Sequence, residues 1–263
     1  MALDYEIHGD DMQFIHIKLK KNQSMVAEAG ALLFMDATVK MDTIFGDGST
    51  NDAGGGLMGK LMGAGKRVLT GESLFMTLFT QQAETEGELA FGAPYPGKII
   101  PIDLSAYGDK IICQRDAFLC AEKGTAIGIE FQKKIGVGFF GGEGFIMQKL
   151  EGKGQVFCHA GGTIYERTLA AGETLKVDTG CLVALSKEVN YNVEFVGGVK
   201  TAIFGGEGLF FATLTGPGKI WLQSLPFSRM ADRIISSSRK HGGSKEDGNL
   251  LGNLGIGNLL GGD

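Results

Sequence analysis

Three glutamates stand out because each lies in a glycine-rich break between apolar runs. Glu143 lies in the stretch FFGGEGFIM, Glu207 lies downstream in the similar stretch IFGGEGLFF, and Glu72 lies upstream in the weaker copy VLTGESLFM. Three equivalent carboxylates around a common axis could hold a cation or a small ligand, or line a polar channel. The alternative is structural: each glutamate accepts hydrogen bonds from backbone amides at its own bend, where glycine tolerates a kink. Both interpretations stay open from the sequence.

The separation between Glu143 and Glu207 recurs throughout the second half of the chain, and we call it the repeat interval. Residues 97–160 and 161–224 align without a gap, which places Gly97 on Gly161. A first unit spans about residues 11–96 and is longer because of an insertion near 46–66. Three units of this size are too small to be independent domains, so we expect them to share one core.

Short alternating runs position the three glutamates. FIHIKL at 14–19 and VNYNVEF at 189–195 alternate apolar and polar residues, the period of a half-buried strand. The sequence therefore predicts an all-β fold of three repeated antiparallel β-sandwich units in a pseudo-threefold arrangement, as a single domain over residues 1–241. Apolar residues at helical spacing predict a C-terminal helix at about 226–239. Residues 242–263 are rich in glycine and leucine and are expected to form a flexible tail.

The insertion in the first unit contains GGGLMGKL at 54–61, which fits the glycine and lysine spacing of a phosphate-binding loop. Leu61, however, stands where that loop needs serine or threonine to reach a magnesium ion, and no strand-then-helix pattern surrounds it. We therefore expect no nucleotide site. The insertion is instead predicted to contact a membrane surface or a protein partner, through its apolar residues Leu57, Met58, Leu61 and Met62.

Composition excludes several classes of function. The chain has 25 basic and 30 acidic residues, and no basic stripe of the kind that nucleic acid requires. No secretory signal and no run of about 18 apolar residues is visible, so a cytoplasmic location is expected. No nucleophile–base–acid set or dinucleotide motif appears, which predicts that the protein is not an enzyme and has no cofactor.

The cysteines show no metal-binding pattern, because none forms a C-x2-C pair. We interpret them as reduced thiols in small apolar core positions, and we predict no metal site. Cys158 and His159 are adjacent, but neighbours on a strand point to opposite faces, which argues against a catalytic dyad.

The glycine-rich insertion, the later GGEG copies and the opening QSMVAEAGAL at 23–32 together resemble a mitochondrial biogenesis family, altered inheritance of mitochondria member twenty-four, with an uncharacterised bacterial and archaeal branch. The resemblance covers about residues 11–240. It implies a fold similar to the tryptophan RNA-binding attenuation protein, with three units of the double-stranded β-helix type. It implies no catalytic residues.

These observations predict a non-enzymatic scaffold or binding protein, associated with a membrane surface or a protein partner. The alternative is a small-ligand or cation-binding module that uses Glu72, Glu143 and Glu207. Exposed strand edges would also allow a homo-oligomer.

Overall fold

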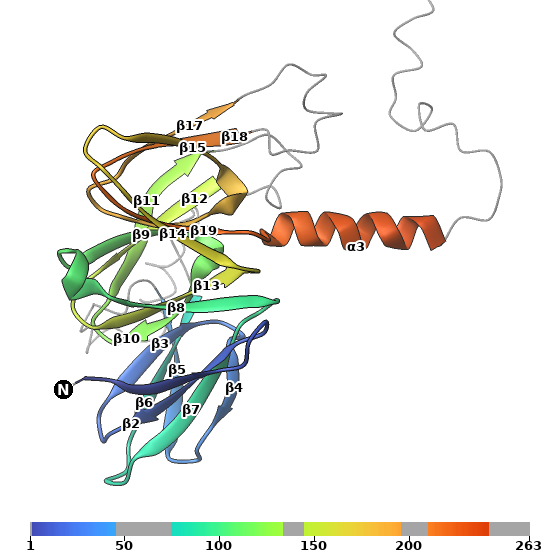
Figure 1. The fold of residues 1–263 in the computed structure, drawn as a ribbon. Coiled ribbons are helices and arrows are strands. Elements are labelled where there is room, and N and C mark those ends of the chain that lie inside the picture. The colour runs from blue at the N-terminus through green and yellow to red at the C-terminus, as the bar shows by residue number, and fades with distance from the viewer. Residues whose placement is uncertain (1, 46–74, 134–144, 196–209, 242–263) are drawn as a thin grey trace, which may run out of the picture. The chain divides into compact units, whose positions relative to one another are not determined.

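The computed structural model describes residues 2–45, 75–133, 145–195 and 210–241. Within these ranges the chain forms strands β1–β19, the short 3-10 helices η1, η2 and η4, and the helix α3 (Figure 1). The first strands are β1 (Asp4–His8), β2 (Phe14–Leu19), β3 (Ser24–Glu28), β4 (Leu32–Met35), β5 (Val39–Phe45), β6 (Phe75–Gln81) and β7 (Gly87–Gly92). The middle elements are β8 (Gly97–Asp103), η1 (Leu104–Tyr107), β9 (Lys110–Gln114), η2 (Arg115–Ala117), β10 (Phe118–Glu122), β11 (Ala126–Lys133), β12 (Phe145–Glu151) and β13 (Gln155–Gly161). The last elements are β14 (Ile164–Leu169), β15 (Thr174–Asp178), η4 (Thr179–Cys181), β16 (Leu182–Ser186), β17 (Asn190–Phe195), β18 (Phe210–Thr215), β19 (Gly218–Gln223) and α3 (Phe227–His241).

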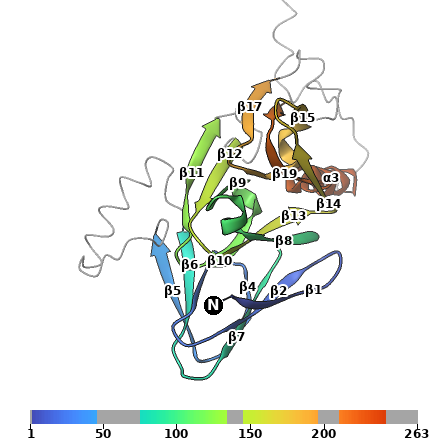
Figure 2. The ribbon, with the colours of Figure 1, turned by 60° about the vertical axis from the view of Figure 1, so that its left-hand side comes forward.

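The strands form four sheets whose strand pairs are antiparallel (Figure 1 and Figure 2). Two sheets have six strands, in the orders β5-β6-β3-β10-β13-β8 and β11-β12-β9-β16-β19-β14. A four-stranded sheet, β1-β2-β7-β4, and a three-stranded sheet, β15-β18-β17, complete the set. The predicted all-β, antiparallel class is confirmed.

Residue alternation explains the strands that fully bury one face only, such as β2, which lies between β1 and β7. In β2, Ile15, Ile17 and Leu19 are fully buried, whereas the residues between them are half-buried. A period of two places every second side chain on the same face of the sheet, so this strand covers a core with one face and meets solvent with the other.

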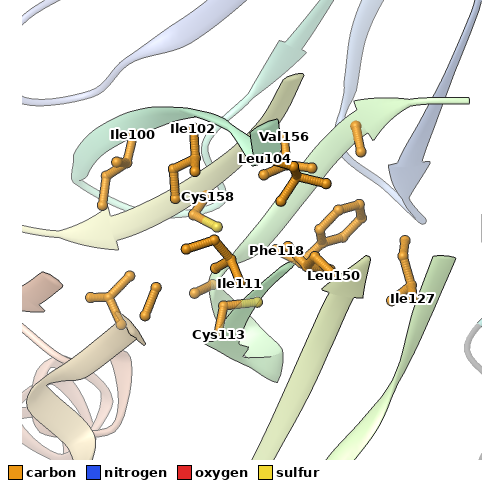
Figure 3. Close-up of a cluster of buried hydrophobic side chains, with 14 of the residues drawn as sticks. Ile100, Ile102, Leu104, Ile111, Cys113, Phe118, Ile127, Leu150, Val156 and Cys158 are labelled. Carbon is orange, nitrogen blue, oxygen red and sulfur yellow. The ribbon is translucent and has the colours of Figure 1, made fainter. Parts of the chain in front are cut away.

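Central strands are buried on both faces and read as continuous apolar runs. β10 lies between β3 and β13, and its residues from Phe118 to Ala121 are all buried. Figure 3 shows an apolar cluster to which both six-stranded sheets contribute, with Ile102 on β8 of one sheet and Ile111 on β9 and Leu150 on β12 of the other. Two further clusters lie against the β1-β2-β7-β4 sheet and between β9 and β18.

The repeat interval reappears in the element boundaries. The starts of β9 and β15, Lys110 and Thr174, are separated by it, as are the starts of η2 and η4, of β10 and β16, and of β11 and β17. The sequence alignment therefore matches elements of the same kind in the same order. The pseudo-threefold arrangement of the whole chain stays a prediction.

Helix α3 spans Phe227–His241, against the predicted range of about 226–239. The chain divides into two compact units, Met1–Phe227 and Ser228–Asp263, so the β-sheets and most of α3 belong to different units. Within the described ranges, no helix combines the length and the apolar character needed to cross a membrane.

Candidate functional site

Glu72, Glu143 and Glu207 lie outside the described residues, as do the apolar residues of the insertion, Leu57, Met58, Leu61 and Met62. Each glutamate belongs to a stretch that connects two paired antiparallel strands: β5 to β6, β11 to β12, and β17 to β18. The three stretches thus occupy the same place in three strand pairs. The binding roles of all seven residues stay predictions.

A group of ionisable side chains inside the β unit was not predicted as a site from the sequence, where only His159 was considered and only as a partner of Cys158. Glu28 ends β3, His159 lies on β13, and Tyr95 lies just before β8; Arg115 and Asp116 begin η2. β3 and β13 flank β10 in one sheet, which brings together residues that are far apart in the chain. The rings of Tyr95 and His159 meet edge to face, with centroids 4.3 Å apart. We call these five residues the Tyr–His cluster.

Two glycines allow the close packing of this cluster. Gly97 and Gly161 are directly opposite each other in the β8–β13 pair. A Cβ on Gly97 would stand 2.8 Å from His159 Nε2, and a Cβ on Gly161 would stand 2.9 Å from a carbon of the Tyr95 ring. The closest clashes are with the backbone, because the same Cβ atoms would stand 2.0 Å from the Ala160 carbonyl oxygen and 2.0 Å from the Leu225 carbonyl oxygen. Both aligned positions therefore need glycine, and the rings pack in the space that the missing side chains leave.

The environment of the cluster shifts three pKa values in the direction that favours neutral groups. Burial, reinforced by the negative charge of Asp116 and opposed by Arg115, raises the pKa of Glu28 from 4.5 to about 7. Burial also raises the pKa of Tyr95 to about 12, with contributions from Asp116 and Glu28. Burial, weakly opposed by the nearby Tyr95 backbone, lowers the pKa of His159 from 6.5 to about 4. Desolvation is the main cause in each case because it disfavours the charged form.

The chemical capacity of the cluster lies in Glu28. With a pKa of about 7, its carboxyl group can take up or release a proton near neutral pH, as a general acid or base must. His159 stays a neutral imidazole over the same range. Perturbed carboxyl groups of this kind are found at functional sites and in structural networks alike.

His159 lacks the hydrogen bonds that buried polar side chains usually make, as do Thr125 Oγ1 and Gln148 Oε1 among the described residues. It is 1% exposed, and neither ring nitrogen makes a hydrogen bond of normal geometry within the described structure. The aligned residue one repeat interval later, Gln223, is fully bonded: it accepts from Gly161 N–H and donates to the Gly180 carbonyl, both at 2.8 Å. The exchange of glutamine for histidine within an otherwise aligned repeat is the sequence signal that could have singled out this site.

Cys158 points away from the Tyr–His cluster. Its thiol packs in the apolar cluster of Figure 3, close to Cys113, whereas His159 contacts Tyr95 on the other face of β13. The argument against a Cys158–His159 dyad is therefore confirmed. All four cysteines are described and none is disulfide-bonded; Cys113, Cys120 and Cys158 are buried in cores, as expected.

Two strand edges form a second candidate site. Within the described residues, β4 pairs only with β7, at the end of its sheet, and β15 pairs only with β18. In the repeat alignment, residues 26–34 of the first unit match 112–120 and 176–184, so the strands that align with β4 are β10 and β16, and both are paired on each side. The same holds for β9, which aligns with β15. In Figure 1, β4 lies in the lower part of the β unit and β15 in the upper part.

Exposed apolar side chains mark the edge of β4. Leu33 is 56% exposed and Phe34 is 43% exposed. The aligned residues of the two paired strands are all buried, namely Leu119, Cys120, Val183 and Ala184. In the described structure, β4 therefore differs from both aligned strands in two ways: it pairs on one side only, and Leu33 and Phe34 are exposed. We call the β4 and β15 margins the open edges.

Comparison with known proteins assigns the family. Residues 5–225 match the family model described as mitochondrial biogenesis AIM24. An uncharacterised protein of Streptococcus pyogenes serotype M6 is 32% identical over 228 residues, which cover 85% of this chain and 86% of that protein. A crystal structure of a Streptococcus pyogenes protein superposes with a TM-score of 0.71 at 26% identity, over 90% of this chain and 100% of the other. Similarity to the tryptophan RNA-binding attenuation protein stays a prediction. The chain belongs to the mitochondrial biogenesis AIM24 family.

Proposed function

We propose that the protein is a non-enzymatic scaffold that binds extended protein segments by adding them as strands to its open edges. The single observation that carries this proposal is the edge of β4 in the described structure, which pairs on one side only and carries the exposed Leu33 and Phe34, whereas both aligned strands pair on two sides and bury the aligned residues. An open edge offers a row of backbone N–H and C=O groups, and an added strand gains its affinity from them. Apolar side chains beside that row give the added strand selectivity.

Backbone direction supports the same role. Asp36 N–H donates to the Glu88 carbonyl on β7 at 2.8 Å. Successive residues of a strand alternate the side to which their N–H and C=O groups point, so those of Met35 point away from β7. Met35 therefore offers one donor and one acceptor to an incoming strand.

A binding experiment with peptides tests this function. Fluorescently labelled peptides with alternating apolar and polar residues, one of them spanning residues 172–180 of this chain, are titrated with full-length protein and followed by fluorescence anisotropy. We expect saturable binding that Met35→Pro weakens at least about tenfold, because proline removes the donor and remains tolerated at a strand edge. Met35→Ala keeps the N–H group and serves as the matched control. Failure of every peptide to bind would overturn the proposal.

A small polar ligand is the second candidate function, and the bonding of His159 favours it. His159 is buried, and neither ring nitrogen makes a hydrogen bond of normal geometry within the described residues, so the imidazole could bind a ligand that both donates and accepts hydrogen bonds. Glu72, Glu143 and Glu207 provide the alternative ligand set. Native mass spectrometry of the full-length protein tests both: added mass lost in His159→Gln assigns the ligand to the cluster, and added mass lost only in Glu143→Gln with Glu207→Gln assigns it to the glycine-rich segments.

The insertion near 46–66 is proposed as a separate contact with a membrane surface, on the basis of its sequence. Deletion of residues 54–65 should reduce co-flotation with anionic liposomes and leave the thermal unfolding of the protein unchanged. Unchanged co-flotation would remove the membrane contact from the proposal without affecting strand addition at the open edges.

A further inference from the structure

Each six-stranded sheet is assembled from two three-stranded halves by one central strand pair. In the first sheet this pair is β3 with β10, and in the second it is β9 with β16. The two pairs have corresponding registers: Cys120 is opposite Ala27 in the first, and Ala184 is opposite Cys113 in the second. Cys120 and Ala184 are separated by the repeat interval, and their partners Ala27 and Cys113 are aligned with each other, so the two central strand pairs join aligned residues in the same register.

β4 has the features of the strand that accepts such a neighbour. β10 and β16 each contain a register shift where they meet β13 and β19. β4 has the same irregularity where it meets β7. The three shifts fall at aligned positions, between Phe118 and Cys120, between Leu182 and Ala184, and between Leu32 and Phe34.

β15 has the features of the other partner. It begins one repeat interval after β9. On one side, β9 pairs with β12, and β15 pairs with β18 in the same way. β9 uses its second side to pair with β16. The corresponding side of β15 is an open edge in the described structure.

We propose that the partner at the open edges is a second copy of this chain, with β15 of one copy pairing antiparallel with β4 of the next. This inference rests on the proposed function and identifies its partner. The internal register places Phe34 opposite Val177 and Met35 opposite Lys176. The contact would join the four-stranded and three-stranded sheets of two copies into one continuous sheet.

Backbone polarity fits this register. Gly216 N–H donates to the Glu173 carbonyl at 2.9 Å, so Glu173 faces β18, and by alternation Lys176 has its N–H and C=O groups at the open edge. Met35 also faces outward, as derived above. A Met35–Lys176 pair therefore exchanges two backbone hydrogen bonds. The corresponding pair inside the chain is Ala121 opposite Val26. Lys123 N–H donates to the Ser24 carbonyl at 3.0 Å two residues further along this strand pair, so by alternation the backbone groups of Ala121 and Val26 also point toward each other.

Lys176 sets the strength of the contact. It is exposed, whereas the residues aligned with it, Val26 and Ile112, are buried at the two internal junctions. Lysine on an edge strand discourages pairing, although its aliphatic stem can lie along Met35 while the ammonium group reaches water. The association is therefore reversible and concentration-dependent, and Lys176→Val should strengthen it.

The contact is head-to-tail, because it uses two different surfaces of the chain. Each added copy leaves one open β4 edge and one open β15 edge at the ends of the assembly, so association continues until a ring closes or a helical filament forms. A self-complementary dimer would behave differently, since it would bury the same surface of both copies and stop at two.

Sedimentation velocity of the full chain over a series of concentrations tests the contact. We expect the average mass of the wild-type protein to rise with concentration, and Lys176→Val to show the same rise at concentrations about tenfold lower, the effect of burying a valine in place of a charged lysine. Met35→Pro and Lys176→Pro should each stay monomeric, whereas Met35→Ala associates. Phe34→Lys, which keeps the backbone donor, replaces Met35→Pro if thermal unfolding shows that the proline variant does not fold.

Mixing the two proline variants gives the decisive result. Met35→Pro retains an intact β15 and Lys176→Pro retains an intact β4, so the mixture should form a one-to-one dimer and nothing larger. Monomers in the mixture and in Lys176→Val at all concentrations would overturn the inference, as would dimers of Met35→Pro alone. If the chain stays monomeric while unrelated peptides bind the β4 edge, the strand-addition function stands and only the second copy as partner is wrong.

Discussion

Gln223 makes two hydrogen bonds at a position where the aligned His159, one repeat interval earlier in the chain, makes none of normal geometry within the described structure. Gln223 lies beside Gly161 and His159 lies beside Gly97, and these two glycines begin the aligned units. The Gln223 amide uses one donor and one acceptor to bond the backbone around it. The His159 imidazole instead packs against the ring of Tyr95. Two equivalent places in the fold thus differ in how their buried polar groups are satisfied.

Gln223→Ala should destabilise the protein by at least about 2 kcal/mol. The substitution removes two buried hydrogen bonds and leaves Gly161 N–H and the Gly180 carbonyl without partners, and buried orphaned groups cost roughly 1–3 kcal/mol each. Urea denaturation measures the free energy of unfolding. Lys153→Ala, at an exposed position on the turn before β13, is the control and should change stability by less than about 0.5 kcal/mol.

His159→Gln should change how stability responds to acid. In the wild-type protein the pKa of His159 is about 4 when folded and near 6.5 when unfolded, so only the unfolded chain binds a proton between these values. This group therefore contributes stability above pH 6.5 that is lost as the pH falls towards 4. Relative to wild type, the variant should gain up to about 3 kcal/mol over that interval. A stability difference that is constant with pH would contradict the low pKa.

Glu28→Gln should have the opposite pH dependence. The pKa of Glu28 is about 7 in the folded protein and 4.5 in the unfolded chain, so the folded state binds the extra proton between these values. Wild-type stability is therefore lost as the pH rises from 4.5 to 7, and the variant should gain up to about 3 kcal/mol relative to wild type over this interval. Glu84→Gln, at an exposed glutamate, is the matched control. An equal response of the two variants would contradict the assignment.

The two titrations offset each other in the wild-type protein. Their windows overlap between pH 4.5 and 6.5, where Glu28 lowers stability with rising pH and His159 raises it. The wild-type contribution of the pair should be nearly flat there, and each single variant should show a slope of opposite sign. This contrast distinguishes the cluster from a general effect of acid on the net charge of the chain.

The fold class could be read from the sequence because local patterns carry it. The alternation in FIHIKL at 14–19 gives β2, and the helical spacing from Phe227 gives α3 to within about two residues. The repeat interval also anticipated which elements would match, such as β9 with β15. Each of these signals is contained in a short stretch or in a simple repetition.

The candidate sites depend on long-range pairing, which local patterns do not determine. The Tyr–His cluster forms because β3, β10 and β13 are neighbours, an order that brings Glu28 near residues from distant parts of the chain. The open edges likewise depend on which strands join successive half-sheets. Alternation shows that Leu32–Met35 forms a strand but not that one of its sides has no partner strand in the described structure.

The distribution of cysteines gives the protein a built-in reporter of its own opening motions. Cys113, Cys120 and Cys158 are buried. A hydrogen bond with Cys158, together with burial, raises the pKa of Cys113, and burial raises the pKa of Cys120. An alkylating reagent therefore reaches these thiols only when the surrounding core opens. Cys113 and Cys158 report on one core and Cys120 on another, while the partly exposed Cys181 provides a fast internal reference. The order in which these thiols are alkylated would show which core opens more often, without any introduced probe.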